Sequence, residues 1–566
     1  MYRRLFLISC FWCFVLFCHS QQNKARTYEL PIRMVPYLSG NFGELRSNHF
    51  HSGIDFKTQG STGHPVYSFD DGWVSRISVS PWGYGKALYI NHYNGMTTVY
   101  GHLLSFNQNL NNIVKNIQYE NESFSFDKSF DKDEIIVKRG ELIAKSGNSG
   151  SSGGPHLHFE IRDTQSQDPI DPLPFFINKI TDTKKPEIKL VRVYPLKGKG
   201  IVNDSNEPAS ASIVKKEDGS YSLNKTFSAW GEIGLGVKAY DYMDNTTNIY
   251  GVKNIRMFVD DSLYFSQQIN RFSFSETRYL NSLTDFSDWV NNRSMVVKLY
   301  KEPNNQLSIY NKLVNNGIID INKERIYKIR YELSDAKGNK RIFNFNIKGI
   351  KGEIPYSNDD SLMEYSKDNR FENENFSINI AKNSLYDDVN FSYTQKDDST
   401  LLSNIHLVCS YDIPLHKSAK YKIKITNDTI SDKSKYYVAS LGKNLNGNSS
   451  MGGEYNNGWM EFSASSFGNF CVMKDVNAPK IEPVNQKNWG KTGVLKFRIS
   501  DNETGISSWR PTIDDKYALF EYDGKTSTIS YKIDIQRIGK DKNHNLKIIL
   551  IDNCGNTTEY NHKFYW

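Results

Sequence analysis

The sequence predicts a mainly β protein made of several domains, and three observations support this prediction. The chain has 566 residues, which at roughly 100 to 200 residues per domain is enough for three to five domains. Aromatic residues make up 13% of the chain and charged residues 23%, which is typical of folded rather than disordered proteins. Short alternating segments separated by glycine turns recur throughout, and this pattern favours β-sandwiches over α/β folds.

The charge balance excludes one class of partner. The chain carries 70 Lys and Arg against 63 Asp and Glu, a net charge of +7. Because this small excess is spread over a long chain, it does not form the basic footprint that nucleic-acid binding requires. We therefore expect no nucleic-acid partner.

The first twenty residues have the pattern of a secretory signal peptide. Arg3 and Arg4 precede an apolar stretch at 5–17, and small residues lead to a cleavage point after Ser20. No later segment reaches the roughly 18 apolar residues of a membrane span. We expect an exported protein without a transmembrane segment, in the periplasm or cell envelope or else extracellular. Three cysteines follow this leader and allow at most one intramolecular disulfide: Cys409, Cys471 and Cys554.

Residues 21–172 are expected to form an antiparallel β domain. Strand patterns at 65–69 and 73–79 flank an Asp-Asp-Gly turn, and those at 87–93 and 96–103 flank Asn94-Gly95, a strong hairpin signal. A polar insertion at 107–134 interrupts this domain.

An internal repeat organises the rest of the chain. We expect an Ig-like β-sandwich with an insertion at 173–351, a β-rich middle module at 352–474, and a second copy of the sandwich at 475–566. Three anchors occur in the same order in both copies: Asp182-x-x-x-Pro186 and Asp475-x-x-x-Pro479, Asp260-Asp261 and Asp514-Asp515, Asp335-x-x-Gly-Asn339 and Asp552-x-x-Gly-Asn556. The two Asp-Asp pairs are interpreted as turn residues rather than calcium ligands.

Seven of the twelve histidines lie between His49 and His158, and two motifs among them indicate metal chemistry. On a strand, His156 and His158 share one face, and His51 and Asp55 share a face if their segment is extended. Histidine and carboxylate donors are what a catalytic zinc uses, with about three protein ligands and one position left for water.

These motifs resemble those of the M23 (LytM/lysostaphin-like) zinc endopeptidases over about residues 35–163. The resemblance includes Tyr100-Gly-His102-Leu and the segments at 42–46 and 147–154. It implies an antiparallel β-sheet peptidase domain, with His51, Asp55 and His158 as Zn²⁺ ligands and His102 and His156 as catalytic residues. Without a His-Glu-x-x-His helix, an imidazole must transfer the proton. We expect His156 to be the base and His102 to steady the oxyanion, although the sequence does not separate these roles.

The resemblance implies an exported zinc metallo-endopeptidase that hydrolyses peptide bonds in the stem or cross-link peptides of peptidoglycan. The alternative is a non-catalytic cell-wall binding or regulatory protein on a degenerate M23 scaffold, and metal content distinguishes the two. The C-terminal β modules are expected to bind cell-envelope protein partners. The insertion at 107–134 is expected to form a wall of the substrate groove, and Glu160 to hydrogen-bond near the site. His49, His64 and His92 stay unassigned.

Overall fold

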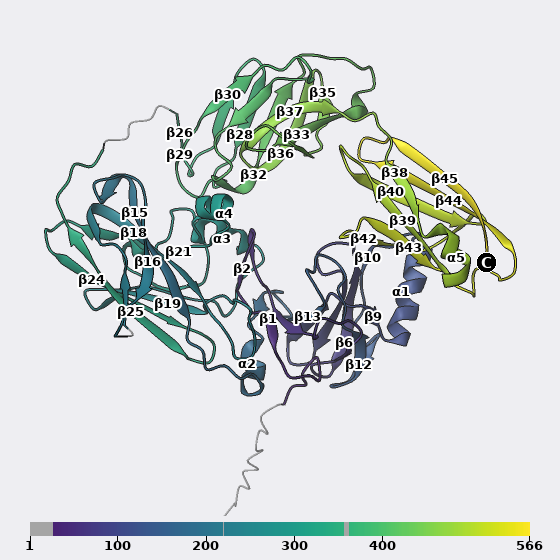
Figure 1. The fold of residues 1–566 in the computed structure, drawn as a ribbon, viewed down its shortest axis with the longest axis horizontal. Coiled ribbons are helices and arrows are strands. Elements are labelled where there is room, and N and C mark those ends of the chain that lie inside the picture. Colours follow the sequence, from purple (N-terminus) through teal and green to yellow (C-terminus); the bar gives the residue numbers. More distant parts are fainter. Residues whose placement is uncertain (1–26, 219, 356–360) are drawn as a thin grey trace, which may run out of the picture.

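The protein folds into four β-rich bodies that follow one another around a ring (Figure 1). The computed structural model describes residues 27–218, 220–355 and 361–566. The architecture is mainly β, as the sequence predicts, with an antiparallel β domain at the N-terminus followed by several β modules. The signal peptide predicted at 1–20 lies outside the described residues.

The N-terminal domain contains one nine-stranded antiparallel sheet and a three-stranded sheet. The strands that carry the histidine motifs are neighbours in the large sheet. Its main path runs through β1 (Leu38–Gly40), β4 (Ile54–Lys57), β13 (His156–Asp163), β8 (Met96–Gly101), β7 (Lys86–His92), β6 (Gly72–Val79) and β10 (Phe126–Ser129). The small sheet contains β5 (Pro65–Tyr67), β12 (Leu142–Lys145) and β9 (Ser105–Phe106).

Two local predictions in this domain are confirmed. Asn94 and Gly95 connect the hairpin of β7 and β8, where Gly95 has the positive φ of 82° that glycine tolerates best. Along β13 the side chains of Leu157 and Phe159 are fully buried in the core. The period of two therefore places His156, His158 and Glu160 on the other face of the strand.

The polar insertion at 107–134 has more regular structure than the sequence analysis anticipated. It contains helix α1 (Gln108–Glu120) and strand β10, which pairs with β6. The Asn107 side chain caps the helix by accepting a hydrogen bond from the Leu110 amide at 3.0 Å. Leu110, Val114 and Ile117 are buried at helical spacing, so this face docks on the domain while the polar residues stay outside.

The first β module forms an eleven-stranded sheet. Its main path runs through β17 (Tyr221–Leu223), β16 (Ala209–Lys215), β15 (Glu187–Val202), β18 (Phe227–Tyr240), β25 (Lys340–Gly349), β24 (Ile326–Ser334), β19 (Asn254–Val259), β20 (Ser262–Gln268) and β22 (Tyr310–Leu313). Two helices lie in the connection between β20 and β22: α3 (Leu280–Leu283) and α4 (Phe286–Asn292).

The middle and last β modules each consist of two sheets. In the middle module, one sheet contains β27 (Asn369–Glu372), β28 (Phe376–Ile380), β32 (Pro414–Lys424), β36 (Trp459–Ser466) and β35 (Glu454–Asn456). The other sheet contains β30 (Tyr393–Lys396), β31 (Ile405–Val408), β37 (Gly468–Lys474), β33 (Tyr436–Leu441) and β34 (Asn448–Ser450). In the last module, one sheet contains β38 (Lys480–Val484), β39 (Val494–Ser500), β43 (Thr528–Lys532) and β42 (Glu521–Asp523). The other sheet contains β41 (Lys516–Tyr517), β40 (Ile506–Ile513), β44 (Asn543–Asp552) and β45 (Thr557–Tyr565).

The repeat stays a prediction, which the strand order of the first and last β modules supports in part, although the first module forms one sheet and the last module two. The pair β15 and β18 corresponds to β38 and β39, and the order β20-β19-β24-β25 corresponds to β41-β40-β44-β45. Asp335 and Asp552 stand at equivalent turns before the final strand of each module. The Asp-Asp pairs at 260–261 and 514–515 turn equivalent hairpins, with both residues of each pair at positive φ.

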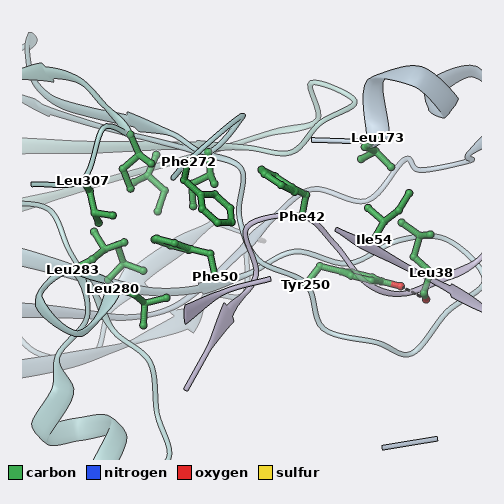
Figure 2. Packing of buried hydrophobic residues seen from close by; sticks show 14 of the residues in the cluster. Leu38, Phe42, Phe50, Ile54, Leu173, Tyr250, Phe272, Leu280, Leu283 and Leu307 are labelled. Atoms are coloured by element: carbon green, nitrogen blue, oxygen red, sulfur yellow. Dashed lines mark hydrogen bonds between the residues drawn. The ribbon is translucent and has the colours of Figure 1, made fainter. Parts of the chain in front are cut away.

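The N-terminal domain and the first β module share one hydrophobic core (Figure 2). Phe42 and Phe50 each place a ring 5.2 Å from that of Phe272 in the module. Tyr250 packs nearby and donates a hydrogen bond to the Leu38 carbonyl at 2.8 Å. These two bodies are therefore joined by buried apolar contact, whereas the last module has a core of its own.

The last β module closes the ring by returning to the N-terminal domain beside α1 (Figure 1). Lys86 pairs with Glu521 at 3.0 Å, and Lys115 of α1 pairs with Asp534 at 2.5 Å. Arg537 lies 3.5 Å over the ring of Tyr119 in α1. The contact also includes aromatic pairs, Trp82 with Tyr522 and Tyr119 with Tyr517, so it combines charged and apolar groups.

Two further features concern the whole described chain. Cys409, Cys471 and Cys554 are free thiols in this structure. Among residues 27–218, 220–355 and 361–566, no helix is long and apolar enough to cross a membrane.

Candidate metal centre

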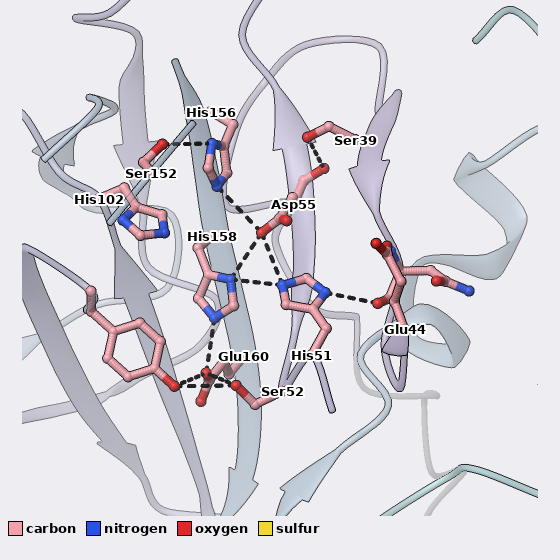
Figure 3. Close-up of polar contacts among 12 residues, drawn as sticks. Ser39, Glu44, His51, Ser52, Asp55, His102, Ser152, His156, His158 and Glu160 are labelled. Atoms are coloured by element: carbon pink, nitrogen blue, oxygen red, sulfur yellow. Dashed lines mark hydrogen bonds and ion pairs between the residues drawn. The ribbon is translucent and has the colours of Figure 1, made fainter. Parts of the chain in front are cut away.

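Three of the predicted site residues converge on one point in the N-terminal domain (Figure 3). His51 precedes β4, Asp55 lies in β4, and His158 lies opposite Asp55 in the antiparallel register of β13. Asp55 Oδ1 is 3.2 Å from His51 Nε2 and 2.9 Å from His158 Nδ1. All three side chains are buried, so little water competes for these donor atoms.

The second nitrogen of each ring determines which atom faces this point. His51 Nδ1 donates to the Asn41 carbonyl at 2.7 Å, and His158 Nε2 donates to Glu160 Oε1 at 2.8 Å. In the neutral rings, His51 Nε2 and His158 Nδ1 then each keep a lone pair. These two atoms lie 3.1 Å apart, beside the Asp55 carboxylate. Two imidazole lone pairs and a carboxylate without a shared proton form a donor set that fits a divalent metal ion.

Glu160 holds the ring of His158 in this position. The carboxylate is fully buried and accepts hydrogen bonds from Ser52 Oγ at 2.5 Å and Tyr84 Oη at 2.6 Å. It also pairs with Arg162 at 2.6 Å. Burial alone would raise its pKa, but Arg162 and then His158 hold the pKa of Glu160 below its usual range. The carboxylate therefore stays charged and fixes the ring of His158, as the sequence analysis expected.

Asp55 is likewise kept ionised. Burial raises its pKa, but the neighbouring His51 and the close contacts with His156 and His158 lower the pKa of Asp55 well below its usual value. Arg46 lies on the other side of the carboxylate, with Nη2 3.4 Å from Oδ2. The residue is therefore available as a carboxylate ligand at neutral pH.

His102 and His156 lie beside this donor set, with their rings 4.8 Å apart. His102 Nδ1 donates to the Ser149 carbonyl at 2.9 Å, and His156 Nδ1 donates to the Gly154 carbonyl at 2.8 Å. Burial and the neighbouring histidines lower the pKa of His102 to about 3. Because both protons sit on Nδ1 in the neutral rings, both Nε2 atoms have a lone pair available for a proton.

His102 has an unusual backbone conformation. It follows the last residue of β8 at φ 57°, and its amide donates to the Tyr84 carbonyl at 2.8 Å. A non-glycine residue in the left-handed region is uncommon and is concentrated at functional sites. This turn directs the side chain back toward His156 rather than along the strand (Figure 3).

The structure adds supporting residues that the sequence analysis did not identify as functional. Asn41 holds His51, while Ser52, Tyr84 and Arg162 hold Glu160. Arg162 follows Glu160 at the strand period of two, which is a usable signal. Tyr84 lies on a separate loop, and nothing in its local sequence connects it with β13.

The three unassigned histidines lie outside the donor set. His49 contacts the Ser47 carbonyl at 2.8 Å, and His64 contacts Ser61 Oγ at 2.8 Å. His92 is buried, and its Nε2 lies 2.8 Å from Thr98 Oγ1. Each has a local structural partner.

The last β module reaches the loop that precedes His156. Lys525 donates to the Asn148 carbonyl and, at 3.4 Å, to the Ser152 carbonyl. Ser152 Oγ is 3.2 Å from His156 Nδ1. Ser152 therefore connects Lys525 of the last β module with His156, a candidate catalytic residue.

Comparison with known proteins gives matches to two regions of the chain. Residues 49–119 and 127–172 match the model of peptidase family M23. Residues 360–475 match the model of the Zu5-like domain. The gap in the first match, at 120–126, falls within the insertion.

Curated relatives resemble the chain over about a fifth of its length. An uncharacterized metalloprotease of Haemophilus influenzae is 35% identical over 111 residues, 20% of this chain and 18% of the relative. The DD-carboxypeptidase/endopeptidase Mpg of Neisseria meningitidis is 33% identical over 118 residues, 21% of each chain. The peptidoglycan DD-endopeptidase ShyB of Vibrio cholerae is 36% identical over 111 residues, 20% of each chain. The alignments thus span about a fifth of the length of these relatives.

Proposed function

Because the chain carries a peptidase family M23 domain, we propose that it is a zinc-dependent endopeptidase acting on the stem or cross-link peptides of peptidoglycan. His51, Asp55 and His158 are the proposed zinc ligands, and His102 and His156 the proposed catalytic residues. The observation that carries the proposal is the convergence of His51 Nε2, Asp55 Oδ1 and His158 Nδ1 on one point beside two further imidazoles.

A bound zinc would supply Lewis acidity, lowering the pKa of a bound water and polarising the scissile carbonyl. The chain supplies the rest. Asn41 and Glu160 hold the protons of the two ligand rings away from the metal position. Asp55 contributes the negative charge that makes the donor set a strong site for a cation.

Proton transfer is proposed for His102 and His156. Hydrolysis adds water across the C–N bond, so one proton must leave the attacking water and one must reach the leaving amine. Each imidazole can accept the first proton at Nε2 while Nδ1 remains bonded to its carbonyl. We propose His156 as the base that takes the proton of the attacking water and passes it to the leaving amine, and His102 as the group that steadies the oxyanion.

The substrate class is supported by the relatives. Two of the three are named as peptidases with DD specificity, and one of these is named for peptidoglycan. Export through the proposed signal peptide at 1–20 would bring the protein to this substrate, in the periplasm or cell envelope. Partners in the cell envelope are proposed for the β modules.

The test is digestion of purified peptidoglycan, followed by mass spectrometry of the fragments. The zinc-loaded protein is expected to release fragments with newly formed peptide termini, and His156→Ala is expected to release none while retaining zinc. Removal of zinc by a chelator should stop the reaction, and added zinc should restore it.

The non-catalytic alternative predicts a different set of results. A scaffold on the same fold would bind peptidoglycan without producing fragments, whether or not zinc is present. A folded wild-type protein with one zinc per chain and no fragment from any peptidoglycan type would refute the endopeptidase proposal.

A further inference from the structure

A second group of potential metal ligands lies in the first β module, away from the histidines. Asp182, Asp241 and Asp335 each offer a carboxylate oxygen, and these atoms lie within 4.8 Å of one another. The side chains are 9%, 2% and 4% exposed, so water does little to separate their charges. Among the described residues, no lysine or arginine forms an ion pair with any of the three.

Three different segments of the module bring these aspartates together. Asp182 precedes β15, Asp241 directly follows β18, and Asp335 begins the turn between β24 and β25. Since these ends of β15, β18 and β24 lie together at one end of the sheet, the cluster results from the fold and not from a local run of acidic residues.

Asp241 is the residue whose bonding is incomplete. Its Oδ1 is buried and has no hydrogen-bond partner. Burial and the charges of Asp335 and Asp182 raise the pKa of Asp241 to about 8. Ionising Asp241 in the absence of a cation is therefore costly, and a bound cation would relieve that cost.

The last β module provides an internal comparison, because it has an equivalent cluster of Asp475, Asp501 and Asp552. Asp501 directly follows β39, as Asp241 follows β18. Its Oδ2 accepts hydrogen bonds from three backbone amides, those of Glu503, Thr504 and Gly505, at 2.8 to 3.1 Å.

The other two carboxylates of that cluster are also satisfied. Asp475 Oδ2 accepts from the Thr504 hydroxyl at 2.6 Å, and Asp552 accepts from the Cys554 and Asn556 amides at 2.9 and 2.8 Å. In the first module the longer segment after Asp241 forms no corresponding amide loop around it. Asp335 likewise accepts hydrogen bonds from the Asn339 amide at 2.9 Å and from Asn339 Nδ2 at 2.7 Å, and Asp182 accepts one from the Lys184 amide at 3.0 Å. The two clusters therefore differ at one position, where Asp501 accepts three amides and Asp241 Oδ1 has no hydrogen-bond partner.

We propose that Asp182, Asp241 and Asp335 form a binding site for a hard divalent cation, calcium. The donors are oxygens only, with no histidine or cysteine among them, which favours calcium over zinc. The site lies where protein atoms rather than many waters surround the ion, a setting that suits calcium better than the more strongly hydrated magnesium. This proposal is independent of the peptidase activity.

The position of the site suggests what the ion would stabilise. The backbone of Asp241 pairs with that of Tyr250 at 2.9 and 3.0 Å. The next residue, Gly251, exchanges two hydrogen bonds with the Asn41 side chain, at 2.8 and 2.9 Å. A cation at Asp241 would therefore stiffen the connection between the first β module and the segment that holds His51.

The test measures calcium binding and thermal unfolding of the purified zinc-loaded protein. In equilibrium dialysis with radioactive calcium, wild type is expected to bind one ion that Asp241→Asn does not retain at the same concentration. Calcium should raise the Tm of wild type by about 2 °C or more and leave that of Asp241→Asn unchanged. Asp501→Asn is the matched control, expected to bind calcium as wild type does.

The change in Tm that Asp241→Asn causes in the absence of calcium distinguishes a cation site from a carboxylate with only a structural role. With a chelator selective for calcium present, Asp241→Asn should melt at or above the wild-type temperature, because one of three repelling charges is gone. A lower Tm of the variant in both conditions, no calcium binding by wild type, or equal binding of magnesium would overturn the proposal. Asp182→Asn repeats the test if Asp241→Asn fails to fold.

Discussion

The first and last β modules, the two copies of the predicted repeat, contact the N-terminal domain on opposite sides (Figure 1). The first copy meets the side of His51 through a shared core and through Asn41 and Gly251. The last copy meets the side of His156 through Lys525. The first copy therefore supports the proposed ligands by a shared apolar core, whereas the last copy reaches the loop before His156 through a contact of charged and aromatic groups.

This difference has a physical consequence. Apolar burial is insensitive to salt, whereas exposed charged contacts are weak and are screened at physiological ionic strength. The ligand side should behave as one rigid unit with the first copy. The contact with the last copy should be displaceable, so that this module can restrain access to His156 without holding the metal.

The largest effects are expected from alanine variants of the proposed ligands and of the proposed catalytic residues, and these two groups should differ in whether zinc is retained. Asp55→Ala and His158→Ala should lose both bound zinc and activity, because three ligands leave no spare donor. His102→Ala and His156→Ala should retain zinc and lose about 10² to 10⁴-fold in kcat. Metal analysis and peptidoglycan digestion of the four purified variants check this, and loss of zinc in His156→Ala would contradict the division.

Glu160→Gln tests the support of the ligand side. The change removes the charge that fixes the His158 ring and leaves Arg162 without its partner. Zinc affinity should fall by about 10 to 100-fold, as measured by competition with a chelating dye. Glu122→Gln, at an exposed residue paired with Arg510, is the matched control. Equal affinities for all three proteins would show that Glu160 does not position the ligand.

Asn41→Ala tests the connection between the ligand side and the first copy. It removes both side-chain hydrogen bonds to Gly251 and leaves buried backbone groups unpaired. The free energy of unfolding should fall by about 1 to 3 kcal/mol, as measured by urea denaturation. Zinc affinity should weaken at the same time, since the Asn41 carbonyl holds His51. A loss of stability with unaltered zinc affinity would show that the two are not linked.

Lys525→Met tests the exposed contact with the last copy and should have the smallest effect. The change keeps the length of the side chain and removes the charge that contacts the Asn148 and Ser152 carbonyls. Zinc content should stay the same, while kcat/KM on peptidoglycan fragments changes by about two- to fivefold. Added salt should reduce the difference from wild type. Identical kinetics at low salt would contradict a role for this contact in access to the site.

The sequence by itself was sufficient for much of the site. Strand alternation predicted that His156 and His158 share a face, because a period of two is a local property. The assignment of His51, Asp55 and His158 as ligands came from the resemblance to the M23 family. The repeat was predicted from turn residues such as Asp335 and Asp552, whose local geometry restricts them in similar ways. The sequence analysis did not anticipate α1, although Leu110, Val114 and Ile117 show helical spacing.

Only the tertiary structure decided which remote segments meet. Tyr84 reaches Glu160 across the sheet, Gly251 reaches Asn41 from another module, and Lys525 reaches the loop before His156. Asp241 is a single aspartate in the sequence and joins Asp182 and Asp335 only because three strands end at one edge. Local periodicity predicts the direction of a side chain along its own strand, but the partners that set its charge and position come from long-range packing, which no short segment encodes.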